Sequence, residues 1–473
     1  MNRVGNAAVK QPRKGRKANR ARSADRRPLN PYPVDTSAEL LRLIGAYQDS
    51  ALAVSFREMV SWIKVGERAT HYLHSYPAKL LPQIAHFFLA ASVLSKQGDT
   101  VLDPFGGTGT VALEALLSGR NAINADANPL ARLIAQVKTR TLSEDELLSA
   151  FEGVQTRYKL ARAGKPPSVV NLEYWYSASD IRALCRLRSA VFAERNKPLR
   201  DFMLVTFSSV CRRISNADPR FSVPVRRKDI GEVDVATRSL VWDQFENQFF
   251  ANAERFCSLR QLGFKSRARH CVGDDARDLH VPGDWDDLGK KRLPDSSVDL
   301  IITSPPYAGA QKYIRASSLS LGWLGLAGSG ELRSFERRNI GREHLDLGEV
   351  QCIAKSGLDH ADTLISAISR DNPRRAAIVA TYLAEMKLAL TEAVRTLRPG
   401  GHFVLVIGDN QVCGREFASS LYLTQILNDL GLDTKLRLVD EIRSRGLITK
   451  RNKTAGMISK EWIILLHKPA VSQ

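Results

Sequence analysis

The spacing of apolar and polar residues alternates along this chain between patterns typical of strands and of helices. The clearest example lies between residues 100 and 139. Residues 100–103 have the pattern of a short buried strand, a glycine-rich loop follows, and residues 110–117 have the pattern of a helix. Gly119 stands where a glycine commonly ends a helix. A second strand at 121–125 and a further helix complete the unit. This order predicts the βαβ opening of a parallel α/β sheet.

The same alternation returns in the second half of the chain and predicts the rest of the core. Its elements are strands at about 267–272 and 298–302, a helix at about 375–397, a turn at 398–401, a strand at 402–407, a helix at about 418–430, and strands at 434–439 and 461–467. Two stretches differ: about 140–265 is helix-patterned and rich in arginine, and about 308–375 is polar and loop-rich. We therefore expect one α/β core of roughly 200 residues that is interrupted twice.

Composition narrows the class of protein. The 473 residues are 44% hydrophobic and 25% charged, which excludes a wholly disordered chain. The net charge of +19 favours a polyanionic partner, either nucleic acid or an anionic membrane surface. No stretch approaches the ~18 apolar residues of a membrane span, and no signal peptide is visible. The six cysteines form no CxxC pair, so we expect neither a zinc knuckle nor a disulfide framework, and a reducing, cytoplasmic compartment.

Much of the positive charge is concentrated near the N-terminus. Residues 1–27 contain ten Lys or Arg and a single acid, Asp25. Large apolar residues are almost absent there, so residues 1–35 are expected to form a disordered basic arm. Two interpretations stay open: an arm that binds nucleic acid or directs localisation, and a tail that only keeps the protein in solution.

The first candidate for chemistry is the glycine-rich loop after the strand at 100–103. Its residues are Asp103, Pro104, Phe105, Gly106, Gly107, Thr108, Gly109 and Thr110. Glycines let the backbone turn sharply and approach a ligand closely, and the following helix offers free amide donors. Asp126 ends the second strand, where a carboxylate can accept both hydroxyls of a ribose. The spacing Gly107-x-Gly109-x-x-Ala112 also fits a dinucleotide fingerprint, so an adenosine-containing cofactor and a plain tight turn both stay open.

The second candidate is the tetrapeptide after the strand at 298–302. It consists of Ser304, Pro305, Pro306 and Tyr307. Two prolines remove amide donors and stiffen the loop. Ser304 and the Pro305 carbonyl can then accept the two N–H hydrogens of an exocyclic amine, while Tyr307 stacks on the base. A structural Pro-Pro turn is the alternative, but a site is favoured because the glycine loop lies in the same α/β core.

Together the two motifs resemble those of the S-adenosylmethionine-dependent DNA amino-methyltransferases, which act on cytosine N-4 or adenine N-6. The glycine loop is similar to their cofactor loop, and Ser-Pro-Pro-Tyr is similar to their catalytic tetrapeptide, in the form more typical of cytosine N-4 enzymes. Residues 71–82 resemble the segment that packs against the methionine end of the cofactor. Asp275, within 273–277, resembles the residue of the loop that contacts the adenine. Residues 398–401 and 408–410 resemble later core motifs.

This resemblance implies an α/β fold: a doubly wound, mostly parallel seven-stranded sheet with a helical insert, a Rossmann-like methyltransferase core. It implies S-adenosyl-L-methionine as the cofactor, bound by Asp103, Phe105, Gly106, Gly107, Thr108, Gly109, Thr110, Asp126 and Asp275. It implies catalysis by Ser304, Pro305, Pro306 and Tyr307, without a metal. The implied partner is double-stranded DNA with the target base flipped out, at the nucleoid, and a cognate restriction endonuclease is a further candidate.

The expected domain organisation follows the two interruptions. It comprises the arm at 1–35, the first part of the methyltransferase core at 36–140, a helical basic insert at 141–265, the core with the catalytic loop at 266–310, a loop-rich insert at 311–375, and the last part of the core at 376–473. Either insert is a candidate for target recognition.

Three other functions stay open. An RNA amino-methyltransferase would use the same kind of pocket. A nicotinamide-dependent dehydrogenase would explain the Gly-x-Gly-x-x-Ala spacing but neither the tetrapeptide nor the net charge. A non-catalytic nucleic-acid-binding protein would explain the charge but neither loop.

Overall fold

The described part of the chain is given by a computed structural model. It comprises residues 30–64, 68–77, 79–228, 241–264, 275–281, 291–309, 313–351, 353, 355–442 and 458–470. Residues 1–29 of the expected basic arm and the strand expected at about 267–272 lie outside the described residues. No helix among the described residues is both long enough and apolar enough to cross a membrane.

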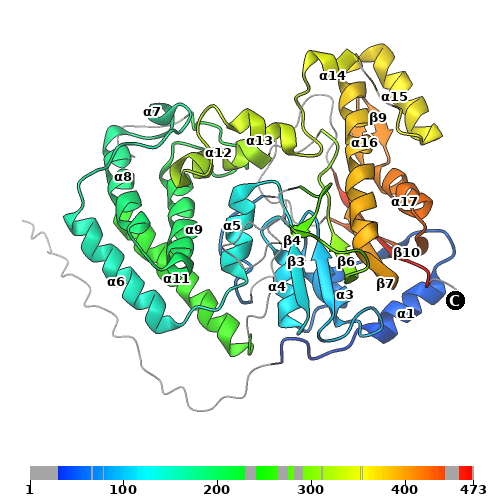
Figure 1. The fold of residues 1–473 in the computed structure, drawn as a ribbon, viewed down its shortest axis with the longest axis horizontal. Helices are drawn as coiled ribbons and strands as arrows, with labels where there is room; N and C mark the ends of the chain where they lie inside the picture. The colour runs from blue at the N-terminus through cyan, green and yellow to red at the C-terminus, as the bar shows by residue number, and fades with distance from the viewer. Residues whose placement is uncertain are drawn as a thin grey trace, which may run out of the picture.

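A seven-stranded sheet runs through the molecule (Figure 1), in the order β1-β10-β11-β7-β6-β2-β3. Neighbouring strands are parallel except at β11, which is antiparallel to both β10 and β7. The expected α/β fold with a mostly parallel seven-stranded sheet is confirmed. The strands are β1 Leu52–Val54, β2 Thr100–Asp103, β3 Asn121–Asn124, β6 Val298–Thr303, β7 Leu397–Ile407, β10 Asp433–Glu441 and β11 Lys460–His467. Two small hairpins pair β4 His280–Val281 with β5 Lys291–Arg292, and β8 Asn410–Val412 with β9 Arg415–Phe417.

Alternate residues of the central strands face two separate cores, as a sheet covered on both faces requires. Leu102 pairs with Ile301, and both enter the core beneath α16 and α17. Their neighbours Val101 and Leu300 also pair, and they enter the opposite core, which α3 and α4 cover. The helices on these two faces are α1 Ser37–Ala46, α2 Phe56–Met59, α3 Pro82–Ala90, α4 Thr110–Leu117, α16 Pro373–Thr396 and α17 Ser419–Asp429.

The helix expected at 110–117 has those bounds as α4, because glycines mark both of its ends. Gly109 precedes it with φ +75°, and Gly119 follows it with φ +77°. The turn expected at 398–401 is different, because β7 already begins at Leu397, which pairs with Val298. Gly400 adopts φ +76° inside this strand, and the register with β6 shifts there, so the glycine makes an irregularity rather than an end.

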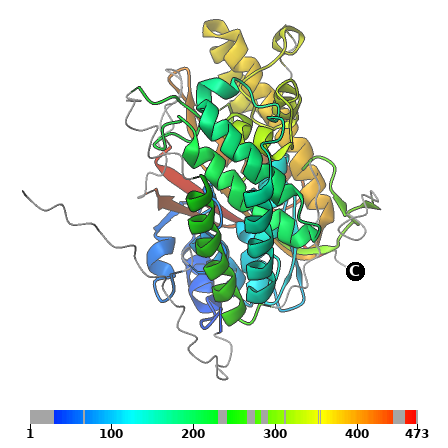
Figure 2. The same ribbon diagram turned by 90° about the vertical axis from the view of Figure 1, so that its left-hand side faces the viewer.

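A layer of helices covers the side of the molecule next to β3 (Figure 2). It consists of α5 Pro129–Lys138, α6 Glu144–Leu160, α7 Leu172–Trp175, α8 Ala178–Phe192, α9 Lys197–Ile214 and α11 Val241–Gln261. These helices share a core of their own, in which Phe202 packs edge-on against Phe249 and Phe256. A third hydrophobic core thus lies beside the sheet.

The stretch expected to be a loop-rich insert at 311–375 is instead largely helical. It contains α12 Tyr313–Leu324, α13 Leu332–Arg338, α14 Leu347–Gln351 and α15 Asp359–Asp371. The serines and glycines of α12 gave it the look of a loop, but Ile314, Leu321 and Trp323 are buried in the core of the helical layer. In α15, Ile365 and Ile368 are buried near α16. Tertiary burial therefore stabilises helices whose local propensity is weak.

Candidate active site

The carboxyl ends of β2, β3 and β6 meet at one edge of the sheet, and a pocket with about 650 Å³ of empty space opens there. In doubly wound sheets, ligands bind at this edge. It brings together six of the expected site residues, which come from four separate segments: Phe105, Gly107, Asp126, Asp275, Ser304 and Pro306. The expected cofactor loop and catalytic loop therefore share one cavity.

A buried hydrogen bond ties these two loops together. Thr303, the last residue of β6, donates from Oγ1 to Oδ1 of Asp103 at 2.7 Å, across 200 residues of sequence. The same carboxylate oxygen accepts the backbone N–H of Phe105 at 3.1 Å. Burial raises the pKa of Asp103 to about 7. Asp103 does not line the pocket, so its position indicates that it holds the two loops in register.

The three glycines of the cofactor loop meet different surroundings. A Cβ on Gly106 would lie 1.9 Å from Oδ1 of Asn124, so this glycine lets the loop pack on β3. Gly109 adopts φ +75°, and a Cβ there would lie 3.0 Å from Cβ of Ala135 on α5. Gly107 has φ +49° and would place a Cβ in open space, on the pocket side of the loop. Only Gly107 therefore has the environment of a ligand-facing glycine.

The two threonines of the loop do not line this pocket. Thr108 is buried and accepts a hydrogen bond from the ammonium of Lys138 at 3.3 Å. Burial lowers the pKa of Lys138 well below its ordinary value. Thr110, the first residue of α4, lines a neighbouring pocket together with His71 and Lys79 from the segment expected to pack against the cofactor.

Asp126 lies where the ribose-binding acid was expected. Its Oδ2 accepts the backbone N–H of Gly107 at 3.0 Å, and its Oδ1 accepts that of Asn128 at 2.7 Å. Burial raises the pKa of this carboxyl. The carboxylate thus lines the pocket and also holds the glycine loop against the start of α5, a second role that the sequence did not indicate.

Asp275 also lines the pocket, but its carboxylate is already in a bidentate pair. Arg277 donates from Nε to Oδ1 and from Nη2 to Oδ2, both at 2.8 Å. The same guanidinium reaches Glu385 on α16 at 3.1 Å. Of the segment 273–277 around Asp275, only residues 275–277 are described.

The four residues of the expected catalytic tetrapeptide lie in two different environments. Ser304 and Pro306 line the cofactor pocket, whereas Pro305 and Tyr307 do not. The Tyr307 side chain forms a hydrogen bond with Glu461 at the start of β11. A Cβ on Gly408 would lie 3.4 Å from Cζ of Tyr307, so this glycine makes room for the ring. Burial, followed by the charge of Asp440, raises the pKa of Glu461 to about 7.

Eight of the described residues that line the pocket were not among the expected site residues. Three of them directly adjoin expected ones, namely Pro104, Ala127 and Ala276. The other five are Tyr76, Tyr313, Arg338, Asn339 and Ile340. Tyr76 lies in the segment 71–82 that resembled the family, so a signal for it existed. The other four lie at the start of α12 and the end of α13 and just after it, in the stretch that looked like a loop, and no spacing in the sequence connects them to the glycine loop.

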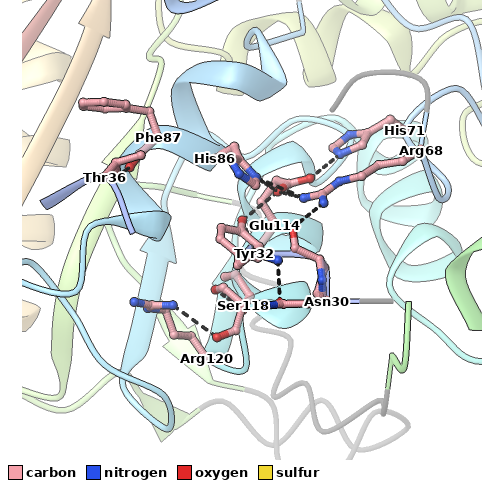
Figure 3. A network of polar contacts seen from close by, with 12 residues as sticks. Asn30, Tyr32, Thr36, Arg68, His71, His86, Phe87, Glu114, Ser118 and Arg120 are labelled. Carbon is pink, nitrogen blue, oxygen red and sulfur yellow. Dashed lines mark hydrogen bonds and ion pairs between the residues drawn. The ribbon is translucent and has the colours of Figure 1, made fainter. Parts of the chain in front are cut away.

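Figure 3 shows a buried polar network around Glu114 on α4, behind the cofactor loop. The Glu114 carboxylate is paired with Arg68, accepts the Tyr32 hydroxyl at 2.6 Å and contacts Nε2 of His71 at 2.7 Å. Burial alone would raise the pKa of Glu114, but Arg68 and then His71 hold it well below its usual range. The network fixes His71 by packing and hydrogen bonding. Among the described residues, no group of three or more His, Cys, Asp or Glu side chains could hold a metal ion.

The pocket has features that fit S-adenosyl-L-methionine. Asp126 offers a carboxylate for ribose hydroxyls, and Phe105, Ala276 and Ile340 offer apolar surface for a planar base. The absence of a side chain at Gly107 leaves the face of the loop open to a ligand.

Known proteins give an independent comparison. Residues 58–136 match the N6/N4 methyltransferase family, described as DNA methylase. The type II methyltransferase M.MvaI of Kocuria varians is 20% identical over 405 residues, which are 81% of this chain and 87% of that protein. The type II methyltransferase M.BsoBI of Geobacillus stearothermophilus is 21% identical over 297 residues, 57% of this chain and 55% of that protein.

A Thermus thermophilus protein solved in complex with S-adenosyl-L-methionine is 20% identical over 38% of this chain and 51% of its own, with a TM-score of 0.19, a likeness too loose to bear on function. The family match over residues 58–136, the two relatives and the two loop motifs together show that this chain is similar to the S-adenosylmethionine-dependent DNA amino-methyltransferases.

Proposed function

We propose that this protein transfers a methyl group from S-adenosyl-L-methionine to the exocyclic amine of a base in DNA, and that cytosine N-4 is preferred over adenine N-6. The observation that carries the proposal is the shared pocket, in which Ser304 and Pro306 lie with Gly107 and Asp126. A cofactor bound by the glycine loop would therefore be next to the loop that binds the amine.

The cofactor, when bound, supplies a methyl group on a positively charged sulfur. Asp126 accepts the ribose hydroxyls with the lone pairs that its two backbone donors leave free. Phe105 and Ile340 pack against the adenine. The Thr303–Asp103 hydrogen bond keeps the cofactor loop and the catalytic loop at a constant separation.

The exocyclic amine is a poor nucleophile because its lone pair is delocalised into the ring. Ser304 Oγ and the Pro305 carbonyl accept its two N–H hydrogens and favour a tetrahedral nitrogen. The nitrogen lone pair would form the N–C bond as the C–S bond of the sulfonium breaks, so that the thioether S-adenosylhomocysteine would leave with the bonding electrons. The methylated nitrogen would then lose one proton to solvent. Catalysis rests on positioning and electrostatics, on a base taken out of the duplex.

Tyr307 would stack on the flipped base. Its hydroxyl is held by Glu461, and Asn410 supports the loop beyond it by donating from Nδ2 to the Ala308 carbonyl at 2.9 Å. The preference for cytosine rests on serine at position 304, the form that resembles cytosine N-4 enzymes.

Methyl transfer from tritiated cofactor onto DNA tests the proposal, with the modified base identified by mass spectrometry. Tyr307→Ala should lower turnover by a factor that corresponds to roughly 1–3 kcal/mol of lost base stacking. Tyr307→Phe keeps the ring and should retain most of the activity. Ser304→Ala should lower turnover about tenfold while cofactor affinity is unchanged.

Matched controls are Tyr174→Ala on α7 and Ser366→Ala on α15, two exposed residues outside the pocket. If Tyr307→Ala and Ser304→Ala turn over like these controls, the tetrapeptide is a structural turn and the catalytic roles are wrong. If the parent protein methylates RNA but not DNA, the substrate is RNA. If the product is N-6 methyladenine, the preference for cytosine is wrong.

A further inference from the structure

A wide groove lies between the helical layer and the segment 72–77, with about 1520 Å³ of empty space. Its walls include residues of α9, α11, α12 and the loop after α9. None of its described lining residues belongs to the glycine loop or the catalytic tetrapeptide. The groove therefore adjoins the cofactor pocket but does not include its two loops.

Among the described residues that line the groove, every formal charge is positive. Arg212, Arg213, Arg227 and Arg255 line it, and none of the described lining residues is Asp or Glu. His74 lines it as well, with Nε2 on Ser208 and with Nδ1 lacking a partner among the described residues. A concave surface with four guanidinium groups and no carboxylate attracts an anion.

Three of the groove arginines are held by neutral acceptors. Arg212 donates to the Phe221 carbonyl, Arg213 to the side-chain oxygens of Gln244 and Gln248, and Arg255 to the Ala251 carbonyl. These neutral contacts orient the guanidinium groups. The carboxylate of Asp218 lies next to the groove in a bidentate pair with Arg220. Its negative charge also acts on Arg212 and Arg227.

Two arginines near the cofactor pocket differ. Arg277 pairs with Asp275 and Glu385, and Arg342 pairs with Glu385 and Glu349. The hydrogen bonds of Arg212, Arg213 and Arg255 go to neutral acceptors instead. The groove therefore concentrates positive charge that can attract an anionic partner.

Two tyrosines of one segment connect the groove to the sheet edge. Tyr76 lines both the groove and the cofactor pocket. Tyr72 is 57% exposed and lines both the groove and the pocket that contains Thr110 and Glu461. An extended ligand in the groove would therefore continue toward the loop that carries Tyr307.

We propose that this groove binds the sugar–phosphate backbone of the DNA that flanks the target base, which makes the helical layer the main DNA-binding surface. The proposal rests on the proposed function for the identity of the polyanion. Arginine pairs well with phosphate oxygens, and a polymer with regularly spaced phosphates suits several guanidinium groups along one groove. Tyr72 offers an aromatic face at the point where the groove meets the catalytic edge.

The test compares two double variants of the full chain by fluorescence anisotropy of a labelled DNA duplex over a series of salt concentrations. Arg213→Gln with Arg255→Gln removes two charges from the groove. Arg182→Gln with Arg186→Gln removes two charges from α8, and both of these arginines are exposed and do not line the groove. Thermal unfolding and cofactor binding by calorimetry verify that each variant is folded.

The groove variant should bind DNA about tenfold or more weakly, and its slope of log affinity against log salt should fall by about 0.9 for each phosphate that is no longer neutralised. The α8 variant should match the parent protein. Equal affinity and slope in the two variants would overturn the proposal. If the groove variant loses affinity for single-stranded RNA but binds the DNA duplex as tightly as the parent protein, the groove does not bind DNA. The proposed function is tested separately, because its failure would appear as absence of methyl transfer by the parent protein.

Discussion

At the scale of single residues, Asp103 shows how one side chain can serve a site without lining it. Its Oδ1 accepts hydrogen bonds from both Thr303 and Phe105, so a single oxygen joins the end of β6 to the cofactor loop. The carboxyl is buried, and burial raises its pKa to about 7. Asp103 can accept these two hydrogen bonds whether its carboxyl is protonated or ionised. The ionised form, however, costs more free energy to bury.

We predict that Asp103→Asn changes the pH dependence of stability, because Asn keeps the Oδ1 acceptor and removes the charge. The folded-state pKa is above the ordinary value of 3.8, so the folded protein holds a proton that the unfolded chain has lost. The stability that Asp103 contributes is full below about pH 4 and is lost as pH rises through about 7. The unfolding free energy of the parent minus that of the variant should therefore fall between about pH 4 and about pH 7. Denaturant titrations at each pH measure it, and a constant difference would contradict a buried charge.

We predict that Asp126→Ala weakens cofactor binding by on the order of 1.5–3 kcal/mol, because a charged acceptor for two hydroxyls is lost. Calorimetry with S-adenosylmethionine gives the affinity. Asp126 also supports Gly107 and Asn128 through their backbone N–H groups. Asp126→Asn is the control that keeps one oxygen acceptor while it removes the charge. Unchanged affinity in a folded Asp126→Ala protein would show that this residue does not bind the ribose.

At the scale of elements, the cofactor loop and α4 follow directly from the glycines around them. Gly109 and Gly119 adopt the left-handed conformation before and after the helix, and its bounds were predictable for that reason. The four helices of 313–371 were not predicted. Among them, α12 and α15 bury a face against other elements, which no local pattern indicates. The site depends on both kinds of element, because Tyr313 and Ile340 complete the pocket.

We predict that alanine at Gly107 and at Gly109 has separable effects. Both positions have positive φ, which costs a residue with a Cβ roughly 1–2 kcal/mol. Gly109→Ala should destabilise the protein further, because its Cβ would contact Ala135 at 3.0 Å. Gly107→Ala meets no atom of the protein within 4 Å, so it should mainly weaken cofactor binding. Unfolding free energy and cofactor affinity are measured for both.

Gly431→Ala is the matched control for these glycines. Gly431 has φ +88°, a Cβ added there would meet no atom within 4 Å, and the residue lies outside the pocket. It therefore reports the cost of positive φ alone. If Gly107→Ala binds the cofactor as well as Gly431→Ala does, Gly107 does not face the ligand.

At the scale of the whole molecule, a sheet with two cores and a helical layer with a third meet at the segment 72–77. The cofactor pocket and the arginine groove lie on the two sides of this segment. The N-terminal stretch is attached to the same region through Tyr32, whose hydroxyl bonds Glu114 on α4. Positive charge is thus supplied both by the groove and by the ten Lys and Arg of residues 1–27.

We predict that deletion of residues 1–27 leaves folding and cofactor binding intact and weakens DNA binding, with a smaller salt slope. The deleted segment carries about half of the net charge but stops before Tyr32. Thermal unfolding, calorimetry and anisotropy measure the three properties. A longer deletion, of residues 1–36, should also lower stability, because Glu114 then loses its Tyr32 partner. DNA affinity and salt slope equal to those of the full chain would show that the segment only solubilises.

The amino-acid sequence by itself determined the strand, glycine loop and helix of 100–117, the order of the two loop motifs, and the mostly parallel sheet. These features are local, because glycine conformations and runs of apolar residues act within a few positions of the chain. The placement of Asp126 and Ser304 at the sheet edge was predictable for the same reason, as the ends of parallel strands meet.

Only the tertiary structure decided which residues close the pocket and where positive charge gathers. Asp103 and Thr303 are 200 residues apart, and Ile340 reaches the cofactor loop from a stretch without a recognisable pattern. The four arginines of the groove come from two helices and a loop, and which acceptors hold them depends on packing between those elements. Such contacts form when buried surfaces pack against each other. Their partners are far apart in the sequence and share no pattern from which the contact could be predicted.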